Sequence, residues 1–158
     1  MQVHQYADGL WRWSVGPYTS AYLEHGDVML LVDPVLPATG DHLARFERAI
    51  ARDLERLGGP ARVLLTRADD PRDADRLVAM TGGTRWAPGD AWPEGITVLP
   101  VGAGGEVALW SAAHRALMPG RALEVRDGAL VAGPGVDAAP MLALGAEVVI
   151  PSAGPMLP

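Results

Sequence analysis

Hydrophobic and polar residues alternate along the first third of the chain with the period of a half-buried strand. Residues 10–15 place two tryptophans on one face and polar side chains on the other. Residues 19–24 and 28–33 flank a short connection that contains glycine, which predicts a β-hairpin. The second of these segments is a continuous apolar run, as expected for a strand covered on both faces, and Asp33-Pro34 ends it.

The middle of the chain changes to a helical period. Apolar residues recur at helical spacing over 41–57, with Asp41 as the expected N-cap and Gly58-Gly59-Pro60 as the stop; they are Leu43, Phe46, Ile50, Leu54 and Leu57. A short apolar strand follows at 62–66, and a second helix is expected over 73–80, begun by Asp70-Pro71. This order predicts a βαβ crossover in which strands 28–33 and 62–66 are parallel neighbours.

After residue 95 the pattern returns to short strands. They are expected at 96–101, 106–111, 115–118, 122–126 and 129–131, with a short helix near 139–144 and a last strand at 147–150. The strands between 96 and 131 are expected to form a second sheet that faces the first. The fold class is therefore α/β with substantial antiparallel content, in a single domain spanning residues 1–158.

Composition narrows the function classes. The 158-residue chain has a net charge of −6 and no cysteine, which excludes disulfides, thiolate metal sites and cysteine nucleophiles. Its basic residues are all arginine, as in proteins from GC-rich bacterial genomes. Because no basic cluster is present, nucleic acid is not an expected partner. No apolar run is long enough to cross a bilayer and residues 1–9 do not resemble a secretion signal, so a cytoplasmic protein is expected.

The order of these segments resembles a known family. The hairpin Ala21-Tyr22-Leu23…Leu30-Leu31-Val32-Asp33-Pro34, followed by a helix and Val63-Leu64-Leu65-Thr66, is similar to the start of a metallo-β-lactamase-fold hydrolase. The segment 106–121 resembles the hairpin that ends in Gly-Asp in that family, and 148–155 resembles its final strand and S-H-G turn. The resemblance implies a compact αββα sandwich: two facing mixed sheets with helices outside.

The chain departs from the family where the family binds metal. The loop that reads T-H-x-H-x-D-H in the family reads Thr66-Arg67-Ala68-Asp69-Asp70-Pro71-Arg72 here. The positions that match the family's ligands, in chain order, hold Arg67, Asp69, Pro71, Arg72, Gly102, Arg121 and Ala153. Asp69 alone keeps a coordinating side chain, and Asp70 beside it adds a second carboxylate. Arginine stays protonated and repels a dication. These departures from the family's pattern therefore predict ion pairs at this place, and no bound metal or other cofactor.

Other residues also offer candidate sites. The four histidines, His4, His25, His42 and His114, are scattered over separate segments. The acidic group Asp69, Asp70, Asp73 and Asp75 fits capping of the second helix, and alternatively a carboxylate-bound cation or a general base. The tryptophans fit a core or an interface better than ligand stacking.

Two functions from different classes follow. The first is a non-catalytic member of the resembling family that binds a small molecule or a protein; its candidate cleft contains Asp33, Thr66, Arg67, Asp69, Asp70, Arg72, Gly102, Arg121 and Ala153. The alternative is a hydrolase with a rebuilt site in the same cleft. Trp11, Trp13 and the apolar tail 155–158 are candidate contacts of a homodimer.

Overall fold

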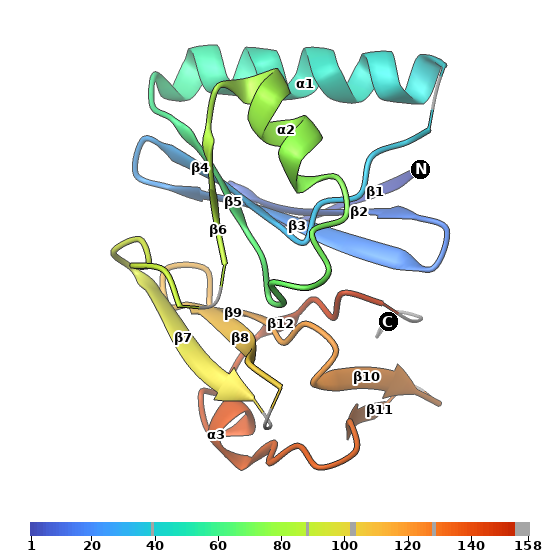
Figure 1. The fold of residues 1–158 in the computed structure, drawn as a ribbon, viewed down its shortest axis with the longest axis vertical. Helices are drawn as coiled ribbons and strands as arrows, with labels where there is room; N and C mark the ends of the chain where they lie inside the picture. The colour runs from blue at the N-terminus through green and yellow to red at the C-terminus, as the bar shows by residue number, and fades with distance from the viewer. Residues whose placement is uncertain (39, 88, 102–103, 128, 154–158) are drawn as a thin grey trace.

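The computed structural model describes residues 1–38, 40–87, 89–101, 104–127 and 129–153 (Figure 1). Gly102 and the tail 155–158 lie outside the described residues. In chain order the elements are β1 (Gln2–Ala7), β2 (Leu10–Val15), β3 (Tyr18–His25), β4 (Val28–Val32), α1 (Asp41–Leu57), β5 (Ala61–Leu64), α2 (Ala74–Thr81), β6 (Thr84–Trp86), β7 (Ile96–Val101), β8 (Glu106–Ser111), β9 (Ala116–Met118), β10 (Leu123–Arg126), β11 (Ala129–Ala132), α3 (Ala139–Leu142) and β12 (Val148–Val149).

The elements form four layers (Figure 1). The first sheet has the order β1-β2-β3-β4-β5-β6, and α1 and α2 cover one of its faces. A second sheet, of order β12-β9-β8-β7, lies against the other face, and α3 lies beyond it. Both sheets are mixed: β4, β5 and β6 run parallel, as do β12 and β9, while the remaining pairs are antiparallel. The expected α/β sandwich of two facing mixed sheets is confirmed.

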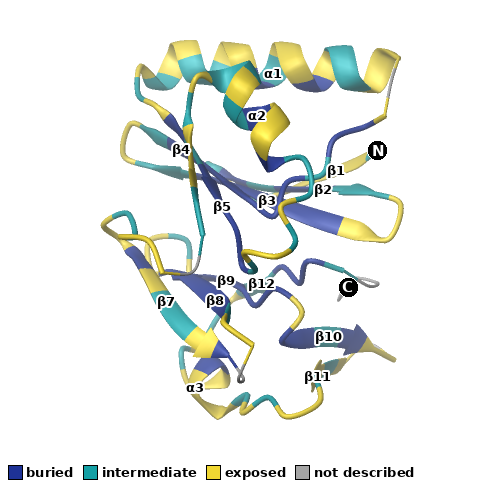
Figure 2. Cartoon of the chain, viewed as in Figure 1, coloured by how far each residue is buried: buried dark blue, intermediate teal, exposed yellow. Residues whose placement is uncertain are grey.

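Strand alternation in β4 builds two cores from one apolar run. Leu30 and Val32 face the second sheet, where they pack with Leu109 and Met118. Met29 and Leu31 point to the opposite side and join the cluster under the helices. Strand β4 is therefore covered by apolar side chains on both of its faces and lies deep in the fold (Figure 2).

The helix α1 covers the first sheet through the residues that its period predicts. Leu43, Phe46, Ile50 and Leu54 belong to the cluster between α1, α2 and the sheet, while the opposite side of the helix faces solvent (Figure 2). A third cluster, which includes Met141 of α3, packs on the outer face of the second sheet.

Several expectations about element details were wrong. The N-cap of α1 is Gly40, without a side-chain cap, and Asp41 is in the first turn. The second helix begins after Asp73, one residue later than expected. Strand β6 was not expected at all. Strands β10 and β11 were expected in the second sheet, but they pair only with each other, as a two-stranded ribbon. The hydrophobic pattern of the sequence shows that two neighbouring strands pair with each other. Which sheet the resulting hairpin joins depends on contacts with residues that are distant in sequence.

None of the helices in the described part of the chain combines the length and the apolar character that crossing a membrane requires.

Candidate functional site

Four segments of the predicted cleft meet at one end of the two sheets. They are the residue after β4, the loop between β5 and α2, the turn before β10 and the residues after β12. Each follows a strand, so a rigid sheet fixes where its first polar side chain lies. The resemblance had assigned metal ligands to three of these segments.

Asp33 and Thr66 form the buried base of this region. The Thr66 N–H donates to Asp33 Oδ1 at 2.8 Å, and the Thr66 hydroxyl donates to Oδ2 at 2.6 Å. Burial raises the pKa of the Asp33 carboxyl, although the two hydrogen bonds from Thr66 and the charge of Arg72 oppose the rise. With both oxygens engaged and only 4% of the residue exposed, Asp33 fixes the ends of β4 and β5 relative to each other.

The Arg72 guanidinium lies at the centre of these segments. We call Arg72 and the residues around it the Arg72 cluster; they include Asp33, Thr66, Asp70 and Arg121. The Arg72 side chain is only 6% exposed. It donates to the backbone carbonyls of Thr19 (3.4 Å), Asp33 (3.2 Å) and Ser152 (3.3 Å), and lies 3.4 Å from Asp70 Oδ2. The ring of Tyr18 covers it, with the guanidinium carbon 4.9 Å from the ring centroid. One cation therefore cross-links β3, the end of β4 and the segment after β12.

Two residues of the Arg72 cluster have an unusual backbone conformation. Asp33 and Arg72 both have φ of 46°, in the left-handed region that residues other than glycine rarely adopt. Each such residue costs about 1–3 kcal/mol, which the surrounding contacts must offset. Two of the four described non-glycine residues with positive φ thus lie at this cluster; the other two, Arg115 and Asp127, lie in turns elsewhere.

Asp70 joins two arginines. Its Oδ2 accepts from the Arg121 guanidinium at 2.8 Å in addition to Arg72. The Arg121 N–H in turn donates to Glu106 Oε1 at 2.8 Å. The turn before β10 is thereby tied both to the loop after β5 and to the start of β8.

Gly120 lets this turn approach the base of the cluster closely. It has φ of +62°, and a Cβ added there would lie 2.7 Å from Thr66 Oγ1 and 3.0 Å from Glu106 Oε1. A side chain has no room at this position without movement of its neighbours. Protein atoms therefore pack up to Thr66 from this side.

Arg67 and Asp69 form a separate pair at the edge. Arg67 Nε and Nη2 donate to the two carboxylate oxygens of Asp69 at 2.9 and 2.6 Å. This hydrogen bonding holds the pKa of the Asp69 carboxyl below its usual value. The side chains are 31% and 70% exposed, so the pair faces solvent and is outside the buried cluster around Arg72.

Comparison with known proteins identifies the architecture. No family model matches the sequence, and no curated protein matches it. Among solved structures, the chain is similar to a metallo-β-lactamase from Hirschia baltica, with a TM-score of 0.64 and 16% identity over 98% of this chain and 90% of that one. It is also similar to the DIM-1 metallo-β-lactamase (TM-score 0.56, 11% identity, 98% and 89% covered) and to one from Pontibacter korlensis (0.51, 14%, 98% and 91%). The chain has the metallo-β-lactamase fold.

The residues present do not fit the metal ion that the metallo-β-lactamase fold implies. A zinc site needs three or four neutral or anionic ligands converging at about 2.0–2.3 Å. Here Asp70 is neutralised by two guanidinium groups and Asp69 by another, while Asp33 is buried against Thr66. Among the described residues, no group of three or more histidine, aspartate or glutamate side chains is placed to hold a metal. A dication bound by Asp69 or Asp70 would lie next to the guanidinium groups that already pair with these carboxylates.

The remaining candidate residues have structural contacts. Ala153 pairs with Tyr18 in an isolated β-bridge. Asp73 accepts the Leu36 N–H at 2.7 Å, and Asp75 pairs with Arg85 on the surface. His114 lies in the turn before β9 with Nε2 2.8 Å from the Glu24 carbonyl oxygen, which connects the two sheets.

Sequence reasoning missed the residues that complete the Arg72 cluster. Tyr18, Thr19 and Ser152 contribute a ring face or a backbone carbonyl, and a carbonyl carries no sequence signal. Glu106 was detectable, because an acid at the start of the otherwise apolar strand β8 requires a partner.

Proposed function

We propose that this protein is a non-catalytic binding protein built on the metallo-β-lactamase fold. The observation that carries the proposal is Arg72: its buried guanidinium lies among the segments to which the resemblance assigns metal ligands. A fixed monovalent cation of the chain itself supplies the cross-links there. It offers neither an open coordination position nor a bound water, on which metal-assisted hydrolysis depends.

The charges of the cluster favour a structural role over a rebuilt catalytic site. A general base needs a carboxylate or imidazole that is within reach of substrate and has a suitable pKa. Asp33 is buried with both oxygens bonded, and Asp70 lies between two arginines. Of the other carboxylates described at the cluster, Asp69 pairs with Arg67, and the partly exposed Glu106 accepts the Arg121 backbone N–H.

Elemental analysis and activity assays test the proposal together. The dialysed protein is expected to carry no stoichiometric zinc, iron or manganese, and a chelator is expected to leave its melting temperature unchanged. Hydrolysis of a β-lactam, a thioester and a phosphodiester is expected at background rates. The Asp70→Asn variant controls for contaminating hydrolases, because it alters the cluster and not an impurity. About one metal per chain, or hydrolysis that disappears in Asp70→Asn, would overturn the proposal.

A further inference from the structure

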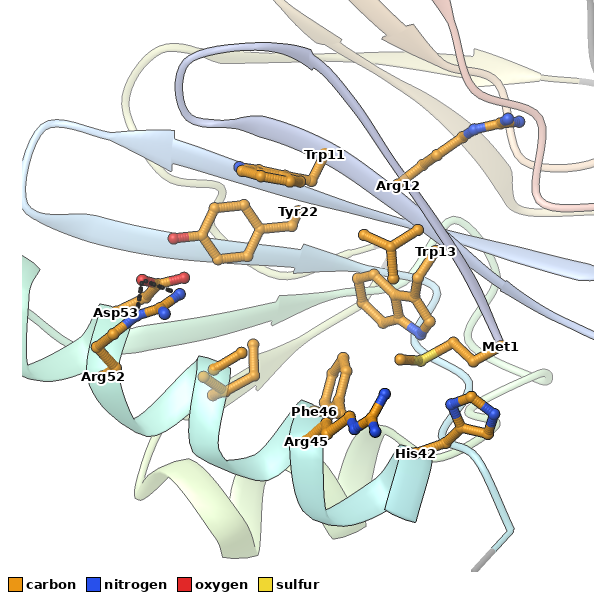
Figure 3. Close-up of a pocket in the computed structure, with 13 residues that line it drawn as sticks. Met1, Trp11, Arg12, Trp13, Tyr22, His42, Arg45, Phe46, Arg52 and Asp53 are labelled. Carbon is orange, nitrogen blue, oxygen red and sulfur yellow. Dashed lines mark hydrogen bonds and ion pairs between the residues drawn. The ribbon is translucent and has the colours of Figure 1, made fainter. Parts of the chain in front are cut away.

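A pocket of about 420 Å³ lies on the outer face of the first sheet, between α1 and strands β1–β3 (Figure 3). Its walls are largely apolar: Trp11 and Trp13 come from β2, Tyr22 from β3 and Phe46 from α1. The volume is within the range of small-molecule sites, about 300–1,000 Å³. This face of the sheet is opposite to the one that packs on the second sheet, so the pocket is distinct from the Arg72 cluster.

The sequence of α1 explains why the pocket is open. The helix presents Arg45, Ala49 and Arg52 along the pocket, and Ala49 is the short side chain among them. Phe46 is anchored against Trp13, with ring centroids 5.2 Å apart, so the large side chains beside Ala49 are fixed in the core. The Trp13 indole N–H donates to the Val35 carbonyl at 2.6 Å, which further fixes this wall.

Two walls have a polar edge beside an apolar face. The Tyr22 ring is buried, and its hydroxyl donates to Glu24 Oε1 at 2.8 Å, so it is already partnered. Trp11 is half-buried and lies beside Tyr22 (Figure 3). The walls therefore offer flat aromatic surface more than free hydrogen-bonding groups, and such surface favours an aromatic or branched hydrocarbon body.

The rim of the pocket carries positive charge on an acidic protein. Arg45 and Arg52 both come from α1, against a net charge of −6 for the whole chain. Arg52 pairs with Asp53 at 3.4 Å. Arg45 makes no ion pair or side-chain hydrogen bond with any residue that the structure describes, and it is an exposed residue among those that line the pocket (Figure 3). One cation at the rim thus has no internal counter-charge within the described chain.

We propose that this pocket binds a small organic anion that has an aromatic or branched hydrocarbon body and a single carboxylate. The body packs on Trp11 and Phe46, and the carboxylate pairs with Arg45. This inference rests on the proposed binding function and gives it a site and a ligand class. It concerns a different face from the Arg72 cluster, so the two proposals can fail separately.

Calorimetric titration with 1-naphthaleneacetate and its neutral counterpart 2-(1-naphthyl)ethanol tests the ligand class. The wild-type chain is expected to bind one naphthaleneacetate saturably, and more tightly than the alcohol. Arg45→Gln should lower the affinity for naphthaleneacetate about fivefold, which is the effect of one partly exposed ion pair. It should leave the affinity for the alcohol unchanged. Arg48→Gln is the matched control, an exposed arginine of the same helix that does not line the pocket.

A second pair of variants tests the place. Ala49→Leu puts a larger side chain into the pocket and should weaken both probes by about tenfold or more. Ala51→Leu adds the same atoms on the exposed side of α1 and should change neither affinity. Because Arg45 is exposed, Arg45→Gln remains informative even if Ala49→Leu folds poorly.

Three results would overturn the inference. They are no saturable binding of naphthaleneacetate at millimolar concentration, equal losses in the Ala49→Leu and Ala51→Leu variants, and a concentration-dependent dimer in sedimentation that Ala49→Leu abolishes. The last result would mean that a second copy covers the pocket. None of them affects the metal analysis, and a stoichiometric metal would contradict the proposed function while leaving the pocket intact.

Discussion

Arginine has opposite roles in the Arg72 cluster and in the pocket between α1 and strands β1–β3. Arg72 is 6% exposed and its donors are taken up by three carbonyls and a carboxylate of the same chain. Arg45 is exposed beside apolar walls and has no partner among the described residues. A cation that its own chain neutralises stabilises the fold, whereas one without a counter-charge beside a pocket is available to a ligand. This difference is why we propose that a ligand binds on the helical face and not at the strand ends.

The largest expected effect is at Arg72. Arg72→Ala removes a buried cation together with its hydrogen bonds to three carbonyls and its contact with Asp70, so it should lower the free energy of unfolding by about 3 kcal/mol. The loss is limited because Ser20 still donates to the Asp33 carbonyl and the Thr19 N–H to the Ser152 carbonyl. Arg85→Ala, which breaks the exposed pair with Asp75, should cost less than ~1 kcal/mol. Urea unfolding measures both. Equal losses would show that Arg72 is no more structural than a surface arginine.

A matched pair of glycines tests the close approach at the cluster. Gly120→Ala should cost about 2–3 kcal/mol, because the new Cβ would lie 2.7 Å from Thr66 Oγ1 at a positive φ. Gly16→Ala has a similar φ of +59° and no atom within 4 Å, so it should cost only the backbone term of about 1 kcal/mol. The melting temperatures of the two variants check this, and a Gly16 loss as large as that of Gly120 would contradict it.

Asp33 predicts a pH dependence of stability. Burial raises its pKa in the folded protein above the usual 3.8, so the folded state holds the proton more tightly than the unfolded state. The stability this gives is complete below pH 3.8 and is lost as the pH rises through the folded-state pKa. Asp33→Asn does not titrate, and its amide can keep both contacts with Thr66.

The unfolding free energies of the two proteins should therefore diverge with pH. From pH 3.5 to 7, Asp33→Asn should gain stability relative to the wild type, by less than the Arg72→Ala effect. Burial is the largest cause of the raised pKa of Asp33; the charges of Arg72, which lowers this pKa, and Asp70, which raises it, also contribute to the difference, because they act on a carboxyl that only the wild type has. A difference that stays constant over this range would mean that burial does not control the Asp33 carboxyl.

The smallest effect is expected at the solvent-facing pair. Arg67→Ala removes an ion pair whose side chains are 31% and 70% exposed. The melting temperature of the Arg67→Ala variant should match that of the wild type within error. Added salt should change the melting temperatures of the two proteins equally. A loss comparable to Arg72→Ala would show that Arg67 belongs to the buried cluster.

Short-range patterns predicted most of the fold. The apolar period of α1 gave its bounds and its packing face, and the run in β4 predicted a strand covered on both sides. The ribbon of β10 and β11 was not predicted outside the second sheet, since that placement depends on contacts far apart in sequence.

The candidate site was predictable only in its outline. The motif comparison marked Arg72 as a replacement, but its acceptors are carbonyls of Thr19, Asp33 and Ser152, up to 80 residues away. Any residue type supplies a carbonyl, so the sequence carries no trace of these contacts. The pocket likewise forms because Ala49 of α1 and Trp11 of β2 line the same space, which neither segment of the sequence shows alone.

The expected homodimer stays a prediction. Trp13, one of its candidate contacts, is 3% exposed and packs against Phe46 within the chain. Trp11 is half-buried at the pocket. A dimer that used these two tryptophans would compete with the pocket ligand, so the sedimentation experiment above also addresses it.

A crystal structure grown with excess zinc and measured at the zinc absorption edge tests the central claim most directly. We expect the Arg72 guanidinium to contact the carbonyls of Thr19, Asp33 and Ser152, with no anomalous peak among Asp33, Asp69 and Asp70. An ordered zinc peak bound by these carboxylates, with Arg72 displaced into solvent, would contradict the account.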